Sequence, residues 1–180
     1  FTKDDNIFSP CFLEYMIKGL ELFKDDDKVF AISGYRWWFP IKYENNSYFR
    51  QNVDYTPWGV GRWVHKNNDN FTGEWFNKQL TIRNIFSLLS LFEFARKEHR
   101  NDILIDQHMR VIMALKEYEV IIPVVSLVKN IGLDGSGVTM PQNTAAVEAL
   151  YDSIELSTDK HFEFAGTGYE CYKYNHKLYK

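Results

Sequence analysis

The N-terminal quarter of the chain pairs one helix signal with one buried-strand signal, and this pairing most limits the possible folds. Ser9 as N-cap and Pro10 at the first helical position, followed by apolar residues at helical spacing, predict a helix over residues 10–24. The acidic cluster at residues 25–27 ends this helix. Residues 28–33 (Lys-Val-Phe-Ala-Ile-Ser) are a β-branched and aromatic run, typical of a buried strand. The alternation predicts an α/β fold.

The rest of the chain extends this prediction. The other expected elements are long loops with one or two short strands over residues 35–63, helices over 73–80, 85–94 and 105–116, a strand over 120–122 that Pro123 cuts, a tight loop over 130–137, and an edge strand with a tail over 169–180. The helix over 105–116 places Met109, Ile112, Met113 and Lys116 near one face. No repeat or linker divides the chain, so we expect a single domain, 1–180, with a mixed sheet and flanking helices.

Composition excludes several classes of protein. The formal net charge of −3 leaves no basic surplus for a phosphate backbone, which disfavours nucleic-acid binding. Two cysteines are too few for a disulfide framework, and this fits a reducing compartment. No apolar run reaches the roughly 18 residues that would cross a bilayer. Aromatic residues make up 17% of the chain, which permits a carbohydrate site as well as a ring-rich core.

Two groups of carboxylates are candidate chemical groups. Asp4 and Asp5 are adjacent acids that could hold Mg²⁺ or Mn²⁺, since these ions prefer oxygen ligands; the alternative is a solvated acidic pair. Asp106 lies where a polar loop turns into a helix with an apolar face. It could act as a general base or could simply favour the positive end of that helix.

Two glycine-containing loops are further candidates. Residues 58–63 (Trp-Gly-Val-Gly-Arg-Trp) combine two large rings with two glycines, which suits either ligand contact or packing at the base of a loop. Residues 130–137 hold three glycines but lack the Lys-Ser/Thr of a phosphate-binding loop, so a tight structural turn is favoured there. No arrangement typical of a nucleophilic hydrolase is evident.

The order of these signals resembles the second half of a GT-A fold glycosyltransferase of the family 2 type, as in bacterial surface-polysaccharide enzymes. A more distant likeness is to the eukaryotic N-acetylglucosaminyltransferase that starts hybrid N-glycans. The resemblance is carried by four segments: residues 4–15 (the acidic motif and its Ser-Pro-x-Phe-Leu helix), 28–34, 56–63 and 126–137 (Ser-Leu-Val-Lys-Asn-Ile-Gly-Leu-Asp-Gly-Ser-Gly). It covers about residues 4–140, and residues 141–180 are an uninterpreted C-terminal extension.

The resemblance implies an activity and a set of roles. It implies transfer of a sugar from a nucleotide-diphospho-sugar, most simply a UDP-sugar, to an oligosaccharide or lipid-linked glycan acceptor. It also implies Mn²⁺ or Mg²⁺ as cofactor, and a cytoplasmic location that extends to the inner face of the membrane. The implied roles are metal ligation by Asp5 and Asp4, general base catalysis by Asp106, sugar contact by Trp58, Gly59, Gly61, Trp63, Trp37 and Trp38, and a structural loop near the site formed by Asn130, Gly132, Asp134, Gly135 and Gly137.

The sequence departs from the family pattern in three ways. Lys3 stands where the family usually has Glu, and residues 138–140 lack the Thr-His that often follows the glycine-rich loop. The nucleotide-binding N-terminal half of the family fold is absent from these residues. A catalytically inactive glycan-binding or interaction module, or a fragment of a longer enzyme, is therefore an alternative. An incomplete sheet also predicts a homodimer, because an open edge and apolar surface favour association.

Overall fold

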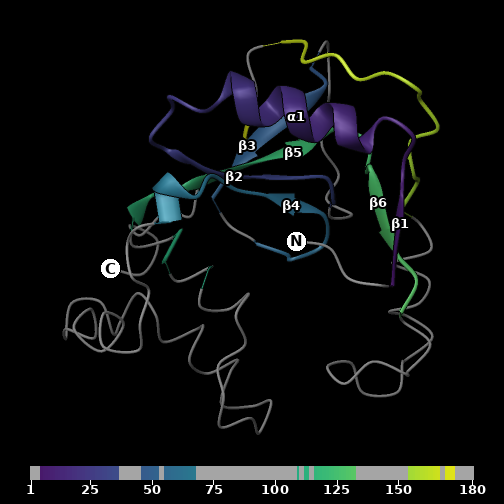
Figure 1. Ribbon diagram of the computed structural model, residues 1–180, viewed down its shortest axis with the longest axis horizontal. Coiled ribbons are helices and arrows are strands. Elements are labelled where there is room, and N and C mark those ends of the chain that lie inside the picture. The colour runs from purple at the N-terminus through teal and green to yellow at the C-terminus, as the bar shows by residue number, and fades with distance from the viewer. Residues whose placement is uncertain are drawn as a thin grey trace, which may run out of the picture.

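The computed structural model describes residues 5–36, 46–52, 55–67, 109, 112–113, 116–132, 154–166 and 169–172. These residues form an α/β structure with a mixed sheet, as the sequence predicted (Figure 1). In chain order the elements are β1 (Asn6–Phe8), α1 (Phe12–Leu22), β2 (Val29–Ser33), β3 (Tyr48–Gln51), β4 (Val60–Gly61), the 3₁₀ helix η1 (His65–Asn67), β5 (Glu119–Pro123), β6 (Val128–Asn130) and β7 (Tyr169–Tyr172).

The main sheet has five strands in the order β4-β2-β5-β3-β7. Strands β2 and β5 pair in parallel at its centre, and every residue of both is buried. A strand buried on both faces reads as a continuous apolar run, which is why sequence alone identified these two. The expectation that Pro123 cuts the second strand was wrong, since Pro123 is its last residue and pairs with Tyr48 on β3. Strands β4 and β3 flank them antiparallel, and β7 pairs in parallel with β3. The prediction of an edge strand near residue 169 is confirmed.

Two layers of side chains cover the sheet. On one face α1 packs over the strands, and residues 154–166, here called the aromatic strap, pass beside it (Figure 1). Phe162 and Phe164 of the strap contact the ring of Tyr15 on α1, at centroid distances of 4.7 and 5.3 Å. On the other face, Met109, Ile112 and Met113 are buried in a cluster with residues of β2, β3 and β5, while Lys116 is exposed; the rest of the helix predicted over 105–116 lies outside the described residues.

The start of α1 differs from the prediction. The helix begins at Phe12, and its N-cap is Cys11, without a side-chain hydrogen bond. The Ser9 amide donates to the carbonyl of Leu127 (2.9 Å), and the Phe12 amide donates to the carbonyl of Ser9 (3.0 Å). Ser9 thus continues the β1–β6 pairing and Pro10 sits in a turn. The N-cap prediction was wrong because a contact with a residue 118 positions away holds Ser9.

Two further points concern helices. The expected helices over residues 73–80 and 85–94 lie outside the described residues. Within the part of the chain that is described, no helix has the length and apolar character needed to span a membrane.

Candidate functional site

A two-stranded ribbon joins two motifs that are far apart in the sequence. Strands β1 and β6 pair antiparallel, with Asn6 opposite Asn130, and they stand at one end of α1 (Figure 1). Beyond the last strand pair, the Ile131 amide donates to the carbonyl of Asp5 (2.8 Å). The ribbon therefore sets the acidic motif against the start of the glycine-rich segment. Neither three-residue strand was expected from the sequence.

Asp5 rests directly against the backbone of Gly132. A Cβ built on Gly132 would lie 2.8 Å from the Cβ of Asp5 and closer still to one of its carboxylate oxygens. Real Cβ atoms do not approach neighbours so closely, so a glycine is what leaves room for the carboxylate. This contact explains why residue 132 is a glycine, which the sequence alone could not explain.

The ribbon also holds two buried polar atoms without a hydrogen-bond partner. They are Oδ1 of Asp5 and Nδ2 of its neighbour Asn6. An unsatisfied buried polar group costs about 1–3 kcal/mol, and a bound ion or ligand is one of its standard explanations. An acceptor and a donor on adjacent residues could be satisfied together by a cation and an oxyanion. Asn6 was not a candidate on sequence grounds, and its position next to Asp5 is the only signal that could have found it.

The chemistry of the Asp5 carboxylate suits one ligand position of a divalent cation. No cluster of three or more His, Cys, Asp or Glu residues able to hold a metal occurs among the described residues. Mg²⁺-type sites in nucleotide enzymes, however, use one or two carboxylates and complete the shell with phosphates and water. Asp5 meets this requirement with a buried oxygen that accepts no hydrogen bond. Asp4, the second acid, lies outside the described residues.

Gly59 brings the predicted sugar-binding loop close to this ribbon. Its φ of +62° is left-handed, and a Cβ there would lie 2.6 Å from Cγ2 of Val128 on β6. The Trp58 ring next to it is half-buried and meets the ring of Tyr35 edge-on at 4.7 Å. Gly59, and with it the chain next to Trp58, thus packs at the Phe8–Val128 end of the ribbon.

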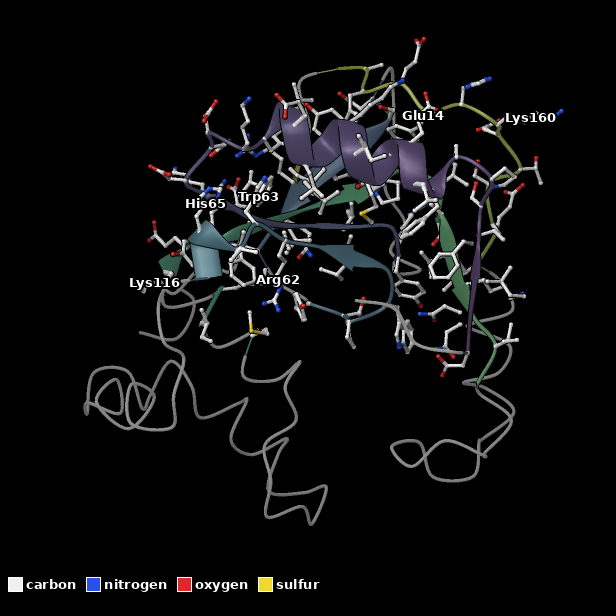
Figure 2. The ribbon with its side chains drawn as sticks, viewed as in Figure 1. Glu14, Arg62, Trp63, His65, Lys116 and Lys160 are labelled. Atoms are coloured by element: carbon white, nitrogen blue, oxygen red, sulfur yellow. The ribbon has the colours of Figure 1, made fainter. Side chains whose placement is uncertain are left out.

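Trp63 lies at the other end of α1. Its indole Nε1 donates to the carbonyl of Leu20 (3.0 Å), and the ammonium of Lys66 lies 4.0 Å from its ring centroid. Figure 2 shows Trp63 with His65 at the end of the helix away from Glu14, whereas the β1–β6 ribbon is at the opposite end (Figure 1). A Cβ on Gly61 would touch Leu20 at 3.2 Å. These are the contacts of packing residues.

A group of charged residues that the sequence did not single out binds three elements together. Arg50 on β3 donates to Glu119 on β5 (2.8 Å) and to Asp26 in the loop after α1 (2.7 Å). Burial by itself raises the pKa of Asp26, but the hydrogen bonds from Arg50 and from the Lys28 amide outweigh it and leave that pKa below its ordinary value. The arrangement is a structural tie, because each charge is met by another.

The remaining predicted site residues lie outside the described residues. They are Asp106, Asp4, Trp37, Trp38, Asp134, Gly135 and Gly137. Of the predicted set, the structure brings together Asp5, Asn130 and Gly132, whereas Gly59 packs on Val128 at the other end of the ribbon.

Comparison with known proteins assigns this chain to no family. No protein-family model, no curated protein and no solved structure matches this chain. Its class therefore follows from its own geometry. It is an α/β protein with a mixed sheet and a short ribbon that buries a carboxylate beside a glycine-rich segment.

Proposed function

We propose that this chain forms the metal-binding and acceptor-side part of a glycosyltransferase that uses a nucleotide-diphospho-sugar. The observation that carries the proposal is the contact between Asp5 and Gly132. These residues belong to two of the four segments of the resemblance, residues 4–15 and the most specific one, 126–137, and they are 127 positions apart in the sequence. A chance likeness of two short segments gives no reason for them to meet.

Asp5 is the proposed ligand of Mn²⁺ or Mg²⁺, with Asp4 beside it in the sequence. The cation, when bound, would neutralise charge that develops on the diphosphate leaving group. The unpartnered Oδ1 of Asp5 supports this role because ligation would satisfy it. The unpartnered Nδ2 of Asn6 is a donor suited to a phosphate oxygen, so the pair favours a diphosphate over a neutral ligand.

Asp106 is the proposed general base. It takes the proton from the acceptor hydroxyl while that oxygen forms its bond to the anomeric carbon, and the bond from that carbon to the diphosphate breaks. A positioned base of this kind contributes about 10²–10⁴ in rate. Trp58 is the described ring proposed to stack on a sugar. Trp63 has less scope for stacking because Lys66 covers its ring and Leu20 accepts its indole N–H.

The first test is calorimetric binding of UDP to the 180-residue chain with and without Mn²⁺. We expect binding that depends on Mn²⁺ and that Asp5→Asn abolishes. Asp25→Asn, which neutralises an exposed acid on the loop after α1, is the matched control and should bind like the unmodified chain. Equal UDP binding with and without Mn²⁺, or an unchanged affinity in Asp5→Asn, would refute the metal role.

The second test concerns transfer itself. Asp106→Asn should bind UDP and Mn²⁺ as before but lose transfer to a glycan acceptor, because only the proton acceptor is removed. Glycan binding by a chain with no affinity for UDP in either condition would instead support the inactive glycan-binding module.

A further inference from the structure

We propose that Asn130 is a positioning residue for the Asp5 carboxylate, an inference that rests on the proposed metal-binding function. The Asn130 side chain is 5% exposed, and both ends of its amide are used. Its Nδ2 donates to Oδ1 of Asn6 (3.2 Å), and its Oδ1 accepts from the Gly132 amide (3.0 Å). The side chain therefore links the two strands of the ribbon at the end where Asp5 lies.

The two partners of Asn130 are the two residues that determine where the Asp5 carboxylate lies. Asn6 follows Asp5 directly in the chain, and Gly132 provides the backbone surface against which the carboxylate packs. The buried amide of Asn130 thus acts together with the backbone bond from Ile131 to Asp5 in fixing the acid-bearing strand end and the glycine wall relative to each other. Loss of that amide would let the wall move away from the carboxylate.

The rest of the ribbon does not depend on Asn130. Phe8 pairs with Val128, and the Ser9 amide donates to the Leu127 carbonyl at the far end of the same pairing. The register of β1 and β6 is therefore held by contacts that leave Asn130 out. Its side chain has a local effect, on the end of the ribbon that carries Asp5.

The test is the affinity for Mn²⁺ in the presence of UDP, measured by calorimetry on the full chain. Residues that orient a metal ligand typically change metal affinity by about 10–100-fold, so we expect Asn130→Ala to weaken binding at least about 10-fold. The control is Ser126→Ala, since Ser126 is also buried and its hydroxyl donates to the Val128 carbonyl (2.7 Å) at the other end of β6. Ser126→Ala should lower thermal stability and leave Mn²⁺ affinity unchanged.

A double-variant measurement separates positioning from general damage. Gly132→Ala should also weaken Mn²⁺ binding, because its methyl group displaces the same carboxylate. If both residues act through Asp5, the Asn130→Ala/Gly132→Ala chain binds Mn²⁺ more tightly than the product of the two single losses predicts. Losses that simply multiply, or an equal loss in Ser126→Ala, would overturn the inference.

The inference and the proposed function fail in different ways. Unchanged Mn²⁺ affinity in Asn130→Ala, with binding intact in the unmodified chain, overturns the positioning role alone. Absence of Mn²⁺ binding by the unmodified chain overturns both.

Discussion

Lys66 offers the sharpest test of what stabilises the connection between the end of α1 and the start of β2. Its ammonium donates to three backbone carbonyls, those of Phe23 (3.0 Å), Asp26 (2.7 Å) and Val29 (3.1 Å). These carbonyls belong to the C-cap of α1, the following loop and the first residue of β2. One side chain from η1 therefore fastens the connection between the helix and the central strand.

The expected cost of Lys66→Met follows from these contacts. A hydrogen bond to a charged group contributes about 1.5–3 kcal/mol, so three bonds have a gross value of roughly 6 kcal/mol. The cation–π contact with Trp63 adds about 0.5–1 kcal/mol. Desolvation opposes this, since burial lowers the pKa of Lys66, and ordering the long side chain costs up to about 2 kcal/mol. We expect a net loss of about 3 kcal/mol.

Urea unfolding followed by far-ultraviolet circular dichroism measures this loss as a difference in unfolding free energy, and thermal unfolding measures it as a fall in Tm. For a chain of this size, about 3 kcal/mol corresponds to a fall of roughly 6–12 °C in Tm. The matched control is Lys24→Met, because Lys24 makes an exposed ion pair with Glu21 and such pairs contribute about 0–1 kcal/mol. If Lys66→Met and Lys24→Met cost the same, the three carbonyl bonds do not hold this end of the fold.

Three further substitutions test other parts of the molecule. Gly59→Ala should cost about 2–4 kcal/mol in unfolding free energy, because a left-handed φ and a clash with Val128 add together; a loss under about 0.5 kcal/mol would contradict this. Asp26→Asn should be destabilising at pH 7, and its difference from the unmodified chain should shrink as the pH falls below 3.8, since the folded-state pKa of the Arg50-paired carboxyl is lowered. Burial raises the pKa of Tyr15 well above 10.0, so the unmodified chain should lose stability above about pH 10, and Tyr15→Phe should lose less; parallel alkaline unfolding curves would refute this.

The central strands could be predicted from sequence because their burial is complete. Residues 29–32 and 120–122 are continuous apolar runs within these strands, so no knowledge of partners was needed to identify them. The helix Phe12–Leu22 was equally evident from its spacing. The strands of the ribbon were not, since three residues are too few to show a period. Their pairing depends on a register between segments more than 120 positions apart.

The candidate site shows the same division. The sequence named Asp5 and Gly132 as separate candidates. It gave no reason to expect that they are in contact. Their contact is a property of the β1–β6 pairing, as are the unpartnered atoms of Asp5 and Asn6. For the two described tryptophans, sequence left ligand contact and packing equally open. Both rings are half-buried against the core under α1, and Lys66 lies over the face of Trp63.

The positions of the two tryptophans indicate which of them can contact a sugar in the proposed acceptor site. Trp63 bonds to Leu20 near one end of α1, and the ribbon with Asp5 stands at the other end. A helix of 11 residues spans about 16 Å at about 1.5 Å per residue, which is too far for Trp63 to stack on a sugar whose phosphates contact Asp5. Trp58, next to the glycine that packs on Val128, lies on the nearer side. If the chain transfers a sugar, Trp58→Ala should therefore weaken acceptor binding, whereas Trp63→Phe should lower stability and leave acceptor binding intact. Equal losses of acceptor binding would mean that the two ends of α1 serve one extended site.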